Sequence, residues 1–372
     1  MKILFDPAEW KGLVRPVPFL KVLTIFITNR CNARCETCFY WQELNNQSQD
    51  LTLDEYRQIQ AKLPPYQDIL ISGGEPTLAP HLPDVIETFI HRPEQAITMP
   101  TNGIKSRQIR DMVKDICERR PNNRFVVGVS LDAIGELHDR IRGVPGNYDK
   151  AIETLRLLCE LKPEHPNLRL TSLTTVFDEN HKQVPELLRE MARLDYVDYL
   201  TVEPLRGAPM KQGLRAPLFY ELRKIQDLLH ELNVGLLSRK QPLEASTMLS
   251  HIRALHREQQ RMLESGRLSI DCKAGTVIGV LEHDGQVRLC EMFEPVGNLR
   301  DFGYDFAAIW NSPAAEAQRR YIKTKECSCT HCVNIGQSLP FHFWPEFERL
   351  MEKRALERRV YIEREAAGVK SC

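Results

Sequence analysis

The segment VLTIFITNRCNARCETC, residues 22–38, places three cysteines directly after a run of β-branched and apolar residues. The run VLTIFIT (22–28) predicts a buried parallel strand, because apolar side chains occupy both of its faces. Cys31, Cys35 and Cys38 then lie in the loop at the carboxyl end of this strand. Three thiols in one short loop indicate a metal site, and the rest of the fold follows from this strand and loop.

The alternation of short apolar runs with longer helical patterns continues to about residue 207. It is typical of repeated βα units around a parallel sheet. The predicted strands cover residues 22–28, 68–72, 95–100, 124–131, 168–176 and 198–204. Six units are fewer than the eight of a closed barrel, so the α/β fold predicted is a partial (β/α)6 TIM-like barrel, open at one side, with functional residues at the carboxyl ends of its strands.

Four parts of the chain are expected from this pattern. They are the barrel (20–207), a helical connector (208–265), a small cysteine-rich module (266–335) and a C-terminal helical tail (336–372). The tail is aromatic at first and then strongly charged. A helix packed on its own protein is the default interpretation of the tail, and contact with a membrane surface is the alternative. Asn147 and Asn180 are predicted to cap helices.

The composition excludes several classes of protein. Fifty basic residues balance fifty acidic ones, so no overall charge favours nucleic acid as a partner. The sequence shows neither a signal peptide nor an apolar stretch long enough to span a bilayer, which predicts a cytoplasmic protein. A hydrophobic content of 42% over 372 residues is sufficient for a core without disulfide bonds.

Eleven cysteines in such a chain favour metal ligation over disulfides. Eight of them form two groups, which we call the first and second cysteine groups. The first group is Cys31, Cys35 and Cys38, and the second is Cys272, Cys290, Cys327, Cys329 and Cys332. Cys117 and Cys159 lie in helical patterns and are expected to be buried thiols, and Cys372 is expected to be a free terminal thiol.

The first cysteine group allows two kinds of metal site. Three thiolates can hold three corners of a four-iron cluster and leave one iron open to another ligand. A zinc ion completed by a distant histidine or cysteine is the alternative. The spacing of the three cysteines alone does not decide between them.

Polar and glycine-rich motifs follow the next three strands. ISGGEP, with Gly73, Gly74 and Glu75, follows the second strand, and TNG, with Thr101 and Asn102, follows the third. SLD, with Ser130 and Asp132, closes the fourth. The carboxyl ends of parallel strands meet at one rim, so we expect these residues beside the first cysteine group.

In this order the motifs resemble those of the radical S-adenosylmethionine (SAM) superfamily, over about residues 20–207. The resemblance implies that SAM chelates the open iron of a [4Fe–4S] cluster held by the first cysteine group. Electrons from a donor such as flavodoxin or ferredoxin would then cleave SAM to a 5′-deoxyadenosyl radical.

The same resemblance implies contacts to SAM. The backbone of Gly73, Gly74 and Glu75 would meet the methionyl amino group, and Ser130 and Asp132 would reach the ribose or carboxylate. Arg142 would pair with the carboxylate, with a solvated arginine as the alternative. Thr101 and Asn102 are further candidates. Thr37 departs from the family pattern, because an aromatic residue is usual before the last cysteine; here Phe39 and Tyr40 follow it.

The second cysteine group begins on a predicted hairpin. Twelve residues separate Cys272 from Gly285 and four separate Gly285 from Cys290, with the turn at Asp284 and Gly285. The spacing of these cysteines alone favours a zinc ribbon. Behind a radical SAM barrel, the arrangement resembles the SPASM module and its shorter form, twitch. That resemblance implies one auxiliary [4Fe–4S] cluster held by Cys272, Cys290, Cys329 and Cys332, with Cys327 as the alternative ligand.

A fully ligated auxiliary cluster would transfer electrons, which favours net oxidation of the substrate. Glu203 and Arg206, after the sixth strand, are the candidate catalytic residues, with a salt-bridged rim as the alternative. The expected substrate is a small alcohol, a sugar-like molecule or a peptide. The short segment before the first strand favours a small molecule, because it leaves no room for a peptide-recognition domain. A non-catalytic iron–sulfur or zinc protein is the competing class.

Overall fold

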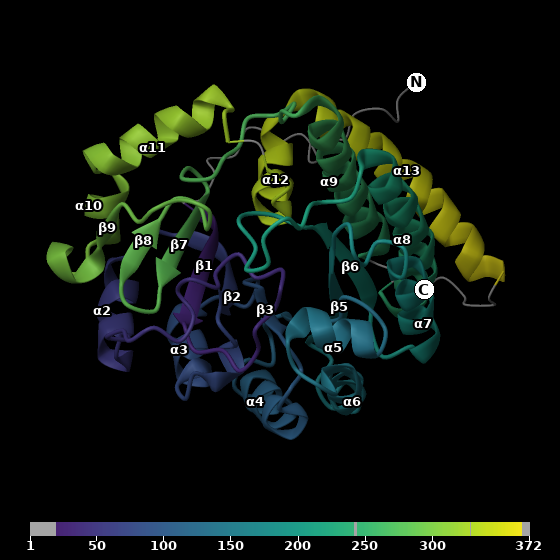
Figure 1. Cartoon of the computed structure of the whole chain (residues 1–372), viewed down its shortest axis with the longest axis horizontal. Helices are drawn as coiled ribbons and strands as arrows, with labels where there is room; N and C mark the ends of the chain where they lie inside the picture. The colour runs from purple at the N-terminus through teal and green to yellow at the C-terminus, as the bar shows by residue number, and fades with distance from the viewer. Residues whose placement is uncertain (1–19, 242–243, 328, 367–372) are drawn as a thin grey trace.

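The computed structural model describes residues 20–241, 244–327 and 329–366 (Figure 1). A nine-stranded sheet runs through this part of the chain in the order β6-β5-β4-β3-β2-β1-β7-β8-β9. Its strands are β1 (Leu20–Thr28), β2 (Tyr66–Gly73), β3 (Ile97–Thr101), β4 (Phe125–Ser130), β5 (Leu168–Val176), β6 (Tyr199–Pro204), β7 (Ile278–Glu282), β8 (Gln286–Arg288) and β9 (Gly297–Asn298).

The first six strands are parallel and pair in chain order, from β1 with β2 through to β5 with β6. They confirm the predicted partial barrel, since β6 and β1 stand at opposite ends of this six-strand run and do not pair with each other. Helices lie outside the arc of strands (Figure 1). They are α2 (Leu53–Lys62), α3 (Leu82–Phe89), α4 (Ser106–Arg119), α6 (Asn147–Cys159) and α7 (Val184–Leu194).

The main hydrophobic core lies between the outer face of the sheet and these helices. In β1, Leu23 and Ile25 are fully buried in this core, whereas Phe26 packs on the inner side against Tyr40 and Val280. Complete burial of a leucine or isoleucine side chain stabilises the fold by about 2 kcal/mol. Alternation along each strand therefore leaves every second side chain facing the interior of the barrel.

The predicted capping role of Asn147 and Asn180 is wrong. Gly146 precedes α6 as its N-cap, and the Asn147 amide donates to the carbonyl of Asn102 at 3.0 Å. Asn180 accepts from the backbone N–H of Phe177 and donates to the carbonyl of Asp132, both at 2.8 Å. Both side chains stabilise loops at the carboxyl rim, which a local capping pattern does not reveal.

The connector forms two long helices, α8 (Phe219–Lys240) and α9 (Ala245–Ser265). Asn233 of α8 is fully buried against β6. Its amide accepts from the backbone N–H of Leu200 at 2.7 Å and donates to the Leu200 carbonyl at 2.9 Å. These bonds occupy the polar groups that an edge strand would otherwise expose.

The cysteine-rich module joins the barrel through strand pairing. β7 lies parallel to β1, with Val22 opposite Ile278 and Phe26 opposite Glu282. β7 and β8 form the predicted antiparallel hairpin, and Gly285 in its turn has φ +90°. The helices that follow the hairpin are α10 (Phe306–Trp310), α11 (Pro313–Thr324) and α12 (Cys332–Ser338). Barrel and module therefore share one continuous sheet.

The tail forms α13 (Phe343–Ala366), which packs along α9 and α8 (Figure 1). Glu352 pairs with Arg257 at 2.6 Å, and Glu348 pairs with Arg261 at 3.2 Å. These contacts support the prediction that the tail packs on its own protein. Cys372 lies outside the described residues. Within those residues, none of the helices has the length and apolarity that crossing a bilayer demands.

A salt bridge between Glu55 of α2 and Arg300 links the barrel to the module and makes stability depend on pH. Arg300 donates from Nε at 2.7 Å and from Nη2 at 3.2 Å, and these bonds hold the pKa of Glu55 at about 2. An unfolded glutamate titrates near pH 4.3, so the stabilisation is complete above about pH 5 and is lost as the pH falls toward 2.

We therefore expect Glu55→Gln to lower the urea midpoint of unfolding more at pH 7 than at about pH 4. Circular dichroism under anaerobic conditions measures both midpoints. If the urea midpoints of wild type and variant differed by the same amount at both pH values, the charge of Glu55 would not contribute to stability.

Candidate active site

A cavity of about 200 Å³ lies at the carboxyl ends of the barrel strands, and we call it the rim cavity. All predicted barrel site residues except Asp132 line it: Cys31, Cys35, Cys38, Gly73, Gly74, Glu75, Thr101, Asn102, Ser130, Arg142, Glu203 and Arg206. Phe39, Leu173 and Thr175 also line it and were not predicted. The structure thus brings together side chains from seven separate segments of the chain.

The loop of the first cysteine group is fixed through its backbone. The Asn45 amide accepts from the N–H of Cys31 at 3.0 Å and donates to the Cys31 carbonyl at 3.1 Å. The N–H of Arg34 donates to the carbonyl of Arg142 at 3.2 Å, at the end of α5 (Glu136–Arg142). A Cβ on Gly143 would lie 2.6 Å from the Arg34 carbonyl oxygen, so a glycine is required there.

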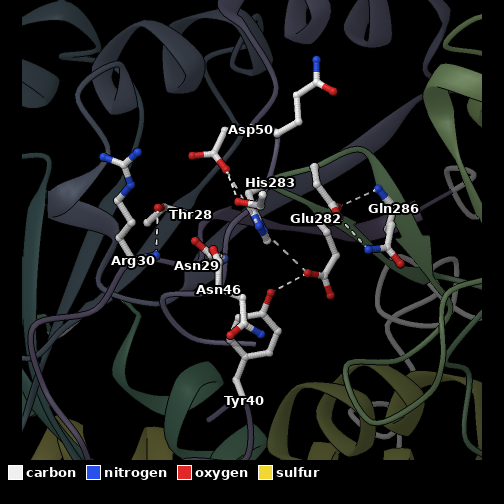
Figure 2. A network of polar contacts seen from close by, with 12 residues as sticks. Thr28, Asn29, Arg30, Tyr40, Asn46, Asp50, Glu282, His283 and Gln286 are labelled. Carbon is white, nitrogen blue, oxygen red and sulfur yellow. Dashed lines mark hydrogen bonds and ion pairs between the residues drawn. The ribbon is translucent and has the colours of Figure 1, made fainter. Parts of the chain in front are cut away.

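A buried polar network joins the same loop to β7 (Figure 2). The Tyr40 hydroxyl donates to Glu282 Oε2 at 2.6 Å, and Arg288 Nε lies 2.5 Å from Oε1. Glu282, His283 and Asp284 offer three ligand atoms within 4.8 Å of one another. Because Tyr40 and Arg288 already occupy both oxygens of Glu282, we interpret this group as structural.

The aromatic residues after the first cysteine group take different positions. Both line the rim cavity, but the Tyr40 hydroxyl donates to Glu282, whereas the Phe39 ring has the Arg206 guanidinium 5.2 Å from its centroid.

Glu75 organises the glycine-rich side of the rim cavity. Its carboxylate accepts from the hydroxyls of Thr77 at 2.6 Å and Thr101 at 2.8 Å, and from the N–H of Asn102 at 2.7 Å. Burial raises the pKa of Glu75, and these three donors oppose that shift. A Cβ on Gly74 would lie 2.2 Å from the carbonyl oxygen of Arg30, so the backbone approach there requires glycine.

Arg142 and Asp132 form a buried ion pair, with 2.8 Å between Arg142 Nε and Asp132 Oδ2. The Arg142 side chain is 12% exposed, lines the rim cavity and lies 3.7 Å from Cys35 Sγ through Nη1. It is not the solvated arginine considered as the alternative. Asp132 is fully buried and also accepts from the N–H of Thr175 at 2.8 Å. Asp132 therefore positions Arg142 and lies behind the cavity wall.

We expect Asp132→Asn to lower the free energy of unfolding by about 3 kcal/mol or more, because it leaves the buried Arg142 charge without its partner. Asp111→Asn is the matched control, since Asp111 pairs with Arg110 at the surface and should change stability by less than about 1 kcal/mol. Chemical denaturation of both variants measures the difference. Equal effects would mean that the buried pair does not stabilise the cavity wall.

A second cavity of about 450 Å³, the module cavity, lies beside the hairpin. Cys272, Cys290, Cys327 and Cys329 line it, and the Asn334 amide donates to Cys290 Sγ at 3.2 Å. The fifth thiol of the group turns toward the barrel.

Cys332 donates from its thiol to Glu203 Oε1 at 2.8 Å. Glu203 pairs in turn with Arg206, whose Nη2 lies 3.5 Å from Glu291, and His331 Nε2 lies 3.1 Å from the same carboxylate. Burial raises the pKa of Glu291, but His331 and Arg206 outweigh it and hold the pKa at about 2. A chain of charged residues thus runs from the rim cavity to the module cavity, and Glu291 and His331 were not predicted.

The spacing of the sulfurs bears on the zinc alternative. Four thiolates around zinc, each about 2.3 Å from the ion, must lie within about 4 Å of one another. Among the described residues, neither cysteine group brings three sulfurs within 4.8 Å. A zinc site in either group would therefore require the sulfurs to move closer together than they lie in the structure. Burial raises the pKa of Cys31 to about 11 and of Cys38 to about 12, so thiolate ligation has to release protons.

Comparison with known proteins identifies both halves of the site. The family model of the radical SAM superfamily matches residues 25–191, and that of an iron–sulfur cluster-binding domain, SPASM, matches residues 272–333. The Fe-coproporphyrin III synthase of Methanosarcina barkeri is 25% identical over 82% of this chain and 79% of its own. The sporulation killing factor maturation protein SkfB of Bacillus subtilis is 22% identical over 86% of this chain and 71% of its own.

Solved structures share the fold. Streptococcus suis SuiB bound to its precursor peptide SuiA superimposes with a TM-score of 0.59 at 16% identity, covering 91% of this chain and 74% of SuiB. Native anSMEcpe with bound AdoMet gives a TM-score of 0.56 at 17% identity, covering 94% of this chain and all of that one.

The chain belongs to the radical SAM superfamily and is an enzyme. More particularly, it is a radical SAM enzyme with a C-terminal SPASM module, whose cofactors are SAM and [4Fe–4S] clusters, an auxiliary cluster among them.

Proposed function

We propose that the rim cavity is where the enzyme cleaves SAM and abstracts a hydrogen atom from its substrate. The observation that carries the proposal is the convergence of three thiols, the backbone at Gly73–Glu75 and the Arg142 guanidinium on one cavity. A [4Fe–4S] cluster held by Cys31, Cys35 and Cys38 would supply the electron that breaks a carbon–sulfur bond of SAM.

The protein's own groups would hold the rest of SAM. The Gly73–Glu75 backbone and the polar edge of Thr101 and Asn102 suit the methionyl amino group, and Arg142 suits its carboxylate. Ser130 lines the same cavity as a donor or acceptor for the ribose. Asp132 acts through Arg142, which it holds by an ion pair.

We also propose that the enzyme oxidises its substrate radical through the auxiliary cluster. Cys272, Cys290 and Cys329 are the proposed ligands common to the sequence pattern and to the module cavity, and Cys327 is the fourth thiol on that cavity. After hydrogen abstraction the substrate radical would lose one electron toward the module and a proton to a base. Glu203, which lines the rim cavity, is the proposed base, and Arg206 orients it through their ion pair.

The substrate class follows from the relatives only in outline. Those relatives are named as a porphyrin synthase and a peptide maturation protein, and SuiB was solved with a precursor peptide. We propose a small molecule or a peptide as the substrate, with flavodoxin or ferredoxin as the electron donor.

Anaerobic reconstitution tests the proposal. The loaded enzyme should hold about eight iron atoms per chain, show thiolate-to-iron charge-transfer absorption and release 5′-deoxyadenosine from SAM under dithionite. A colourless protein that binds zinc alone would contradict it, and so would an iron-loaded protein that leaves SAM intact.

A further inference from the structure

A third cavity of about 360 Å³ lies inside the barrel, and we call it the lumen cavity. The inner faces of β1, β2, β3 and β6 form one wall, and helices α9 and α12 form the other, across the open side of the barrel. Figure 1 shows both helices in the gap between β1 and β6. The volume of the lumen cavity is within the range of small-molecule binding sites.

The wall of the lumen cavity is apolar along most of its length. Met248, Ile252 and Leu255 follow one another at helical spacing on α9, and Leu70 and Val333 face them from β2 and α12. All five are only partly buried although they line an interior cavity, which indicates open space beside them. Burial lowers the pKa of His251, also on this wall, to about 4, so its ring is neutral at physiological pH.

Charged groups occupy the two ends of the lumen cavity. Asp68 and the exposed Arg124 lie at the amino ends of β2 and β4, where Arg124 pairs with Glu244 at 3.2 Å. Glu203 lies at the other end and lines the rim cavity as well. The lumen cavity and the rim cavity therefore share Glu203, the proposed base, as part of their walls.

Small side chains form part of the lumen wall near Glu203. Thr98 and Thr201 line the lumen cavity, and the hydroxyl of Thr201 lies 2.9 Å from that of Thr171. Gly128 of β4 carries no side chain at the same level, opposite Thr171. Tyr199, opposite Thr171 on β6, is the bulky residue on this part of the wall.

We propose that the lumen cavity binds an apolar alkyl or aromatic part of the substrate, while the carbon that reacts stays at the rim beside Glu203. This inference rests on the proposed function, because it places a substrate at the SAM site. The substrate is thus a molecule with a polar reacting end and an apolar extension.

The inference is tested by calorimetry, which measures how tightly the anaerobic holoenzyme binds n-hexanol, n-octanol and n-decanol. An apolar cavity should bind each longer alcohol more tightly, by roughly fourfold per methylene. Ile252→Trp fills the cavity and should abolish this binding, whereas Thr247→Trp places the same bulk on the exposed side of α9 and should leave it unchanged.

Two further measurements keep the outcomes distinct. Ile252→Ala enlarges the cavity without crowding it and should shift the preference toward the longest alcohol, so it decides the matter if Ile252→Trp does not fold. Release of 5′-deoxyadenosine in the same samples reports the proposed function separately. The lumen inference alone would be overturned if 5′-deoxyadenosine release were intact but the alcohols did not bind, or bound with the same affinity at every chain length. It would also be overturned if Ile252→Trp left alcohol binding unchanged.

Discussion

Serine in place of Cys31, Cys35 or Cys38 is expected to abolish 5′-deoxyadenosine release and to lower the iron content from about eight to about four atoms per chain. A serine hydroxyl does not replace a thiolate as an iron ligand, and no other thiol lines the rim cavity to substitute for the lost one within the described residues. The loss of SAM cleavage should be complete, because the electron that breaks the carbon–sulfur bond would come from this cluster.

Cys159→Ser is the matched control for these three variants. Cys159 is a partly buried thiol at the end of α6, away from all three cavities, so its replacement should leave iron content and SAM cleavage unchanged. Iron analysis and chromatography of the SAM products measure both quantities. Retention of SAM cleavage in a Cys35→Ser enzyme would contradict the assignment of the first cysteine group.

The strand pattern carried most of the fold prediction. VLTIFIT has apolar side chains on both faces, and LRLTSLTTV is rich in β-branched residues. Both patterns suit parallel barrel strands, because helices cover one face and neighbouring strands enclose the other. The order of the motifs then placed the rim residues, since parallel strands bring their carboxyl ends together. Both inferences use local sequence and one topological rule.

The contacts that the sequence did not reveal join distant segments. β7 was predicted as half of a hairpin, but its parallel pairing with β1 depends on how the module docks, which no local pattern encodes. Tyr40 and Glu282 are 242 positions apart and meet only for the same reason. α5, seven residues long and mostly polar, has too few turns to show a hydrophobic period.

For Asp132 the sequence predicts the position in the fold correctly but not the contacts of the side chain. Its motif position at the end of β4 put it at the rim, but its side chain turns behind the cavity wall to Arg142 and the N–H of Thr175. The direction of a side chain just after a strand depends on the loop backbone. The sequence therefore predicts the neighbourhood of such a residue better than its partner.

The second large effect is expected from replacing a ligand of the auxiliary cluster. Cys290→Ser should remove about four iron atoms and abolish product formation, yet leave 5′-deoxyadenosine release intact, because SAM is cleaved at the rim cavity. Cys290 lies on the module cavity next to Asn334 and does not line the rim cavity. If Cys290→Ser also abolished SAM cleavage, the two cysteine groups would not hold separate clusters.

A comparison of Cys327→Ser with Cys332→Ser identifies the fourth ligand. Cys327 lines the module cavity with Cys272, Cys290 and Cys329, whereas the Cys332 thiol donates to Glu203. Cys327→Ser should therefore lose the auxiliary iron and Cys332→Ser should keep it, since a serine hydroxyl can still donate to Glu203. The reverse result would make Cys329 and Cys332 the ligand pair, and Glu203 would then contact the auxiliary cluster through one of its ligands.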